Sequence, residues 1–223
     1  MGLATAFGVL MAGPVSADAC PAGDFIGDLD LLGPCTINGA IDGNITITDG
    51  SLTVTVDGSV DGNIEQVGDG SVWFAGTVSG DILEQGDGTV RIEATGIVGG
   101  GIAEGGDGNI GIRGLVNGNV SEKDAGSVPI SGTVNGNVRE EGDLEPPNQI
   151  IPFFLPGGVI NGNVSERGDG NVNHSGTING NLSERGDGNI NISATGIVNG
   201  KVSEKNNGTV NNSGTVTGKI KED

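Results

Sequence analysis

A unit of about 18 residues repeats along most of the chain, and it constrains the possible folds more than any other feature. It reads INGNVSERGDGNVNHSGT at residues 160–177, and close variants follow at 178–197 and 198–215. This period is too short for a pair of helices, and it fits one coil of a solenoid whose apolar face is covered by the next coil. The repeat therefore predicts an all-β fold, a parallel β-helix (β-solenoid) with about 18 residues per coil.

Aligned on the pattern apolar-x-Gly-x-apolar, the repeats give nine full coils and a partial one. The coils begin at Ile41, Val60, Val78, Val98, Val116, Val134, Ile160, Ile178 and Val198, and the partial coil begins at Val216. Within a coil, apolar residues are two apart, as at Val72 and Phe74, which is the period of a strand. The Gly-Asp-Gly and Ser-Gly-Thr segments between these runs predict corners.

The composition limits the classes of partner. The 223 residues carry a net charge of −19, which argues against nucleic acid as a partner because phosphate backbones would be repelled. The 45 glycines show no Gly-X-Y period, which excludes collagen. Beyond the N-terminal region, the sequence has no apolar stretch of the about 18 residues that a membrane helix needs, so we expect no transmembrane segment in the mature chain.

The first 17 residues have the pattern of a secretory signal peptide. An apolar run spans residues 3–12, and Val15-Ser16-Ala17 supplies small residues for cleavage after Ala17, although no Lys or Arg precedes the run. Export would place Cys20 and Cys35 in an oxidising compartment, which predicts a disulfide between them. We therefore expect a secreted or bacterial cell-surface protein with an N-terminal cap at residues 18–40 and a repeat domain at 41–223.

An insertion of about eight residues interrupts the repeats at about residues 143–159, within GDLEPPNQIIPFFLPGG. Its four prolines oppose a regular strand and predict a loop. The loop is apolar, so it either folds back over the side of the rod or offers a contact to a partner. On the second interpretation, Phe153 and Phe154 are the candidate contact residues.

Eight glutamates share one position of the repeat. They are Glu84, Glu104, Glu122, Glu140, Glu166, Glu184, Glu204 and Glu222. We interpret them as a solvated acidic ladder, because one glutamate per coil cannot supply the six to eight oxygens that calcium takes. We therefore expect no cofactor, with Ca²⁺ as the alternative that remains open. The single histidine, His174, cannot form a zinc site alone, and no nucleophile with a base can be assembled, so we expect no enzyme.

Segments such as SGTVNGNV, GNINIS and TVNNSGTVTG resemble the β-helical passenger repeats of bacterial autotransporters and filamentous-haemagglutinin-like adhesins. The resemblance covers residues 41–223, and the C-terminal membrane β-barrel of autotransporters has no counterpart in the sequence. It implies export, surface display, and adhesion or self-association.

The sequence thus favours a non-enzymatic solenoid that acts in adhesion, self-association or extracellular structure, with a protein or glycan surface or a second copy as partner. Two alternatives stay open, because a fold alone does not decide function. One is a polysaccharide-active β-helix enzyme. The other is ice binding through a polar ladder at Ser71, Thr89, Asn109, Ser127, Asn171, Asn189 and Thr209.

Overall fold

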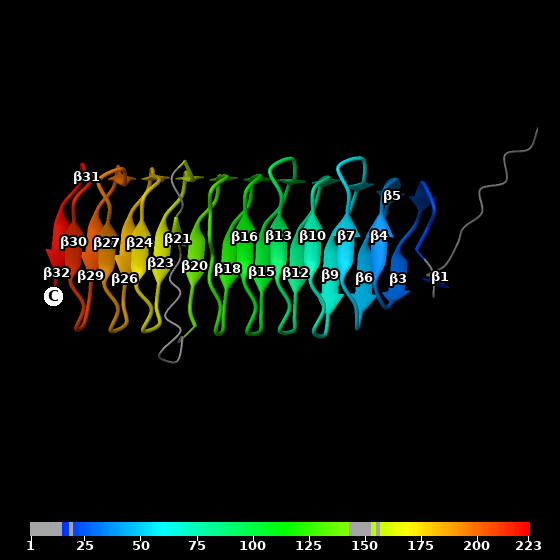
Figure 1. Ribbon diagram of the computed structural model, residues 1–223, viewed down its shortest axis with the longest axis horizontal. Helices are drawn as coiled ribbons and strands as arrows, with labels where there is room; N and C mark the ends of the chain where they lie inside the picture. The colour runs from blue at the N-terminus through cyan, green and yellow to red at the C-terminus, as the bar shows by residue number, and fades with distance from the viewer. Residues whose placement is uncertain (1–14, 18–19, 143–152, 155–156) are drawn as a thin grey trace, which may run out of the picture.

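The computed structural model describes residues 15–17, 20–142, 153–154 and 157–223. These residues form an all-β parallel solenoid of about ten turns with about 18 residues per turn, and they contain no helix. Figure 1 shows the coils stacked side by side along one long axis, in chain order from one end of the rod to the other. The fold class predicted from the repeat is confirmed.

Three faces run along the rod, and face A is a parallel sheet of 12 strands. Its strands are β1 (Val15–Ala17), β3 (Leu29–Leu32), β6 (Ile45–Thr48), β9 (Ile64–Val67), β12 (Ile82–Glu84), β15 (Ile102–Glu104), β18 (Val120–Glu122), β20 (Val138–Glu140), β23 (Val164–Glu166), β26 (Leu182–Glu184), β29 (Val202–Glu204) and β32 (Ile220–Glu222).

Face B is a parallel sheet of 11 short strands. They are β2 (Phe25–Ile26), β5 (Ala40–Asp42), β8 (Ser59–Val60), β11 (Thr77–Val78), β14 (Ile97–Val98), β17 (Leu115–Val116), β19 (Thr133–Val134), β22 (Val159–Ile160), β25 (Thr177–Ile178), β28 (Ile197–Val198) and β31 (Thr215–Val216).

Face C consists of one sheet of five strands and one of four. They are β4 (Cys35–Ile37), β7 (Leu52–Val54), β10 (Val72–Phe74), β13 (Val90–Ile92) and β16 (Ile110–Ile112), then β21 (Phe153–Phe154), β24 (Val172–His174), β27 (Ile190–Ile192) and β30 (Val210–Asn212). In the coil after β16, only Ile130 bridges to Ile112. Its neighbour Pro129 has no N–H to donate, which accounts for the break.

The core follows from the alternation of side chains along each strand. In β13, Val90 and Ile92 are fully buried, whereas Arg91 between them points outward. The same pattern repeats along the rod and fills it with stacked Val, Ile and Leu side chains, with Phe74 as the largest fully buried one. The exception is the last coil, where no residue of β30, β31 or β32 is buried. A one-residue slip of register would bring the polar set inside, so this alternation fixes the register.

Asparagine ladders join successive coils on the outside of the rod. In a ladder that starts at Asn117, the side-chain amides of Asn135, Asn161, Asn179 and Asn199 each donate to Oδ1 of the asparagine one coil earlier, at 2.7 to 2.8 Å. A second ladder joins Asn119, Asn137, Asn163 and Asn181, where Oδ1 of the first three also accepts the backbone N–H of the next asparagine at 2.8 Å.

The N-terminal segment is part of the same architecture. Strands β2, β3 and β4 already lie in faces B, A and C, so residues 18–40 supply strands to all three sheets ahead of the first repeat at Ile41. Cys20 and Cys35 are joined by a disulfide, with their Cα atoms 5.4 Å apart.

In the part of the chain that the structure describes, no helix has the length and apolar character to cross a membrane.

Candidate functional site

The outward side chains of face C form a regular grid, because each strand presents every second residue and neighbouring strands are in register. In the central column, Thr53, Trp73, Arg91 and Gly111 occupy successive coils. The bridge at Ile130 places Pro129 next in this column. One flanking column carries Thr89 and Asn109, and the other carries Glu93, Arg113 and Ser131.

Trp73, the only tryptophan of the chain, is half exposed on this face. The guanidinium carbon of Arg91 lies 5.3 Å from the centroid of its ring, which is within the range of a cation–π contact. Glu93 accepts from Nε of Arg91 and lies 3.5 Å from Nη1 of Arg113. Two guanidinium groups share one carboxylate, so this patch is locally positive on a chain whose net charge is −19.

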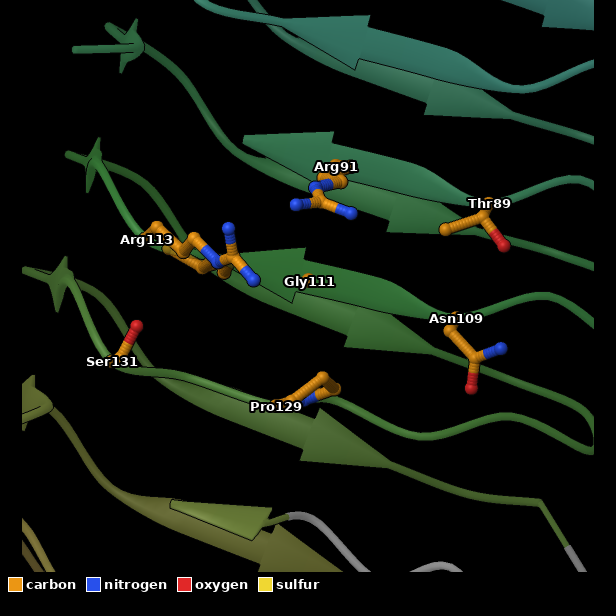
Figure 2. Close-up of a pocket in the computed structure, with 8 residues that line it drawn as sticks. Thr89, Arg91, Asn109, Gly111, Arg113, Pro129 and Ser131 are labelled. Carbon is orange, nitrogen blue, oxygen red and sulfur yellow. The ribbon is translucent and has the colours of Figure 1, made fainter. Parts of the chain in front are cut away.

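Gly111 leaves a hollow of about 230 Å³ at the centre of the grid. Figure 2 shows Gly111 between Arg91 of the preceding coil and Pro129 of the next, with Asn109 and Arg113 on either side in its own coil. Thr89 and Ser131 complete the rim. The hollow is smaller than the about 300 to 1,000 Å³ typical of sites for drug-sized ligands, so it suits a single ring or charged group.

Coil stacking does not require the glycine at position 111. A Cβ atom there would meet nothing closer than Cγ of Arg91, at 4.0 Å. By contrast, a Cβ atom at Gly108 would lie 1.6 Å from the carbonyl oxygen of Gly88 in the preceding coil. Gly108 is therefore needed for the close approach of two coils, whereas Gly111 only opens the surface.

The arrangement is suited to an anion attached to a ring. Arginine presents several N–H donors in a fixed plane that matches the geometry of a carboxylate. Thr89, Asn109 and Ser131 add hydroxyl and amide groups around the hollow, and the Trp73 ring lies beyond Arg91 in the same column. Sequence reasoning missed this site. The feature of the sequence that could have revealed the site is that a tryptophan, an arginine and a glycine occupy the same outward repeat position in successive coils.

The predicted contact pair lies on the same face. Phe153 and Phe154 form strand β21, which pairs in parallel with β24 opposite Asn173 and His174. The loop predicted for the insertion is therefore wrong at these two residues, because the chain returns there to the sheet. Residues 157–159 of the predicted loop lead into β22, which begins at Val159. Residues 143–152 and 155–156 lie outside the described residues.

The predicted solvated ladder of glutamates is wrong for seven of its eight members. Glu84, Glu104, Glu122, Glu140, Glu166, Glu184 and Glu204 are between 0 and 4% exposed, and only Glu222 is exposed. The cause is strand alternation: each glutamate follows a buried Val, Ile or Leu by two residues and so points into the rod. The carboxyl groups form a column inside face A, in register from coil to coil.

Backbone donors of the adjacent corner hold each buried carboxyl group. In six of the seven, Oε1 accepts the N–H of the residue two positions later, at 2.6 to 3.0 Å for Gly86, Gly106, Asp124, Gly142 and Gly168. Gly186 donates to Glu184 in the same way. Oε1 of Glu204 accepts the N–H of Gly208 instead, at 3.0 Å. These bonds satisfy corner N–H groups that would otherwise be buried without partners.

Burial raises the pKa of five of these carboxyl groups, and the proximity of neighbouring glutamates raises it further in Glu84, Glu122 and Glu166. The pKa of Glu84 is raised to about 8, and those of Glu122 and Glu166 to about 10, in each case mainly by desolvation. Desolvation also raises the pKa of Glu104 and of Glu184. Glu84, Glu122 and Glu166 are therefore held largely in the protonated form at neutral pH.

The other polar side chains singled out in the sequence take structural positions. His174 is buried on the inside of face C, where its Nε2 lies 3.1 Å from the carbonyl oxygen of Ile197, and burial lowers its pKa. The polar row considered for ice binding bonds along the rod: Asn109 Oδ1 accepts from Ser127, and Asn189 Oδ1 accepts from Thr209. Within the described residues, no group of three or more His, Cys, Asp or Glu side chains could hold a metal ion.

Comparisons with protein-family models, curated proteins and solved structures find no match for this chain. The solenoid fold is therefore established by the structure itself, and functional inference starts from the face C site.

Proposed function

We propose that this protein is a secreted or cell-surface, non-enzymatic β-solenoid that attaches to an acidic polysaccharide through face C. The observation that carries the proposal is the grid centred on Gly111, where Arg91 and Arg113 flank a hollow in line with the exposed ring of Trp73. The solenoid supplies a rigid, extended surface on which such a grid can be held in register.

An acidic sugar fits this chemistry better than an acidic peptide does. A uronic acid ring carries a carboxylate for the arginines, hydroxyl groups for Thr89, Asn109 and Ser131, and a C–H face that packs against an aromatic ring. The net charge of −19 opposes the approach of any polyanion, but charges beyond about 8 Å are largely screened at physiological ionic strength. Recognition would therefore be local, and adhesion would come from many weak contacts.

Binding without cleavage is favoured by the lining of the hollow. Its residues, Thr89, Arg91, Asn109, Gly111, Ile112, Arg113, Pro129 and Ser131, include no carboxylate. Glycoside hydrolysis ordinarily uses a pair of carboxyl groups on either side of the scissile bond. The enzyme alternative is decided by the same experiment as the binding proposal.

The test is calorimetric titration of the protein with oligogalacturonate, a chain of galacturonic acid, and with its methyl ester, which has the same backbone without the charge. We expect binding to the acid and at least about tenfold weaker binding to the ester, since one charge-assisted hydrogen bond contributes about 1.5 to 3 kcal/mol. Gly111→Val should fill the hollow and abolish binding with the fold intact, because there is room for the side chain and valine favours strands.

Ala103→Val is the matched control, because Ala103 is an outward strand residue on face A. It should bind like the wild type, and circular dichroism should show the same β signal for all three proteins. Equal binding by wild type and Gly111→Val would refute the site. Shortened oligosaccharide after incubation would instead identify an enzyme.

A further inference from the structure

The buried glutamate column of face A is the most unusual feature of the core. Seven carboxyl groups follow one another inside the rod, one per coil, with strand neighbours about 4.8 Å apart. Two ionised carboxylates at that distance repel only weakly in water, but the repulsion grows severalfold in the low dielectric of a protein interior. Seven buried negative charges in one column would therefore oppose the stacking of the coils.

The hydrogen-bond pattern shows how the column can be stable. Oε1 of each glutamate is held by a corner N–H, whereas Oε2 has no hydrogen-bond donor among the described residues in six of the seven: Glu84, Glu104, Glu122, Glu166, Glu184 and Glu204. Successive glutamates are in register, as for Glu84 with Glu104 and Glu122 with Glu140, and contact with the neighbouring carboxyl group contributes to the raised pKa of Glu84 and Glu122. Ionised carboxylates only accept hydrogen bonds, so these contacts require a proton on one partner.

We propose that this column is a chain of shared protons, in which carboxyl–carboxylate hydrogen bonds between adjacent glutamates join successive coils, so that the rod tightens in acid and loosens in alkali. Each proton bound on folding belongs to the column as a whole, because coupled groups titrate together. The proposal concerns the cohesion of the rod and is independent of any ligand on face C.

The direction of the pH effect follows from linkage. The pKa of Glu84, Glu122 and Glu166 is higher in the folded chain than the ordinary value of 4.5. Between 4.5 and about 8 to 10, the folded chain binds more protons than the unfolded chain, so the free energy of unfolding falls as the pH rises through this window. Below pH 4.5 the glutamates are protonated in both the folded and the unfolded chain, so their contribution to stability is fully present.

The charged groups around the column lie on the outside of the rod. The corners beside it carry exposed aspartates at Asp87, Asp107, Asp124, Asp169 and Asp187. The outward side of the same coils carries Glu65, Lys123, Arg139, Glu141, Arg167, Arg185 and Lys205. Arg139 and Arg167 both pair with Glu141, outside the column. The other buried titratable group among the described residues is His174, on the inside of face C, which contacts the backbone of face B.

The first polar position of the column shows which substitution tests the proposal. Gln66 precedes Glu84 in the same register and is fully buried, with its Nε2 donating to the carbonyl oxygen of Gly50 at 3.2 Å. An amide is a neutral group that can both donate and accept, as a protonated carboxyl group can. Glutamine therefore fits this column and imitates a glutamate that never loses its proton.

The experiment is urea unfolding of the whole chain from about pH 5 to about pH 9 for the wild type, Glu122→Gln and the double variant Glu122→Gln/Glu166→Gln. We expect the wild-type midpoint to fall steadily across this range. The slope of the free energy of unfolding against pH reports the difference in bound protons between the folded and unfolded chain. This difference should be smaller by about one proton in the single variant and by about two in the double variant. Both variants should be more resistant to urea than the wild type at about pH 8. Asp57→Asn removes one exposed charge elsewhere and should keep the wild-type slope.

Infrared spectroscopy gives a readout that does not depend on unfolding. The band of protonated carboxyl groups should persist in the folded wild type at about pH 7, where exposed carboxyl groups are ionised, and should weaken in the double variant. A wild-type midpoint that does not fall with pH, or a slope unchanged by both substitutions, would overturn the proposal. The proposal would also be overturned if CaCl₂ at about pH 8 stabilised the wild type but not Glu122→Gln. That result would identify the column as a cation site.

Discussion

The guanidinium group of Arg91 packs over the ring of Trp73, with its central carbon 5.3 Å from the ring centroid. The two residues are directly opposite each other on β10 and β13, so the register of face C fixes their contact. Glu93 holds Arg91 from the other side through Nε. The tryptophan thus helps to set the position of a cation at the edge of the hollow.

Trp73→Ala should weaken binding of oligogalacturonate about tenfold, because it removes both the apolar platform and the cation–π contact. Half of the Trp73 side chain is exposed, so the free energy of unfolding should change by no more than about 1 kcal/mol. Calorimetric titration and urea unfolding measure the two effects separately. Trp73→Phe keeps a ring and should restore part of the affinity, whereas unchanged affinity in Trp73→Ala would remove the tryptophan from the site.

The two asparagine ladders should differ in their contribution to stability, and a pair of residues in one corner tests this. Asn161 exchanges only side-chain hydrogen bonds with Asn135 and Asn179. Oδ1 of Asn163 also accepts the backbone N–H of Asn181 at 2.8 Å, in addition to its side-chain contacts. Removing Asn163 therefore leaves a backbone donor without its partner.

We expect Asn163→Ala to lower the free energy of unfolding by about 2 kcal/mol and Asn161→Ala by about 1 kcal/mol or less. Chemical unfolding of both variants beside the wild type measures the difference. The two substitutions remove the same atoms from the same corner, so each controls for the other. Equal losses would show that the backbone contact adds nothing to the ladder.

The sequence predicts the architecture well because the repeat sets both the coil length and the positions of Val and Ile that fill the core. The prediction that the glutamates face solvent is wrong because it relies on the charge of the side chain and ignores the position of each glutamate within its strand. Glu122 follows the buried Val120 by two residues, and that spacing alone places it inside.

The face C site could not be predicted in the same way, because it depends on neighbours in three different coils. Trp73, Arg91 and Gly111 share a repeat position, but the hollow also needs Arg113 from the next column and Pro129 from the next coil. Which columns are adjacent follows from the cross-section and corner widths of the coil. Those quantities emerge from packing rather than from the period of the sequence.

His174 should oppose the glutamate column in the pH dependence of stability. Burial lowers its pKa below the ordinary value of 6.5, so below that pH the unfolded chain binds more protons and the folded chain loses stability as the pH falls. The glutamates act in the other sense, since their protonation favours the folded chain. The wild type should therefore be most stable in mildly acidic solution, between the two effects.

His174→Ile should remove the loss on the acid side. Isoleucine occupies the corresponding inward position in the next coil, at Ile192, so the replacement fits the stack. Urea unfolding at about pH 5 should show a higher midpoint than the wild type, whereas at about pH 8 the lost contact with Ile197 and the gained apolar burial should nearly cancel. If the difference between variant and wild type were the same at both pH values, His174 would not be the group whose charging weakens the rod in acid.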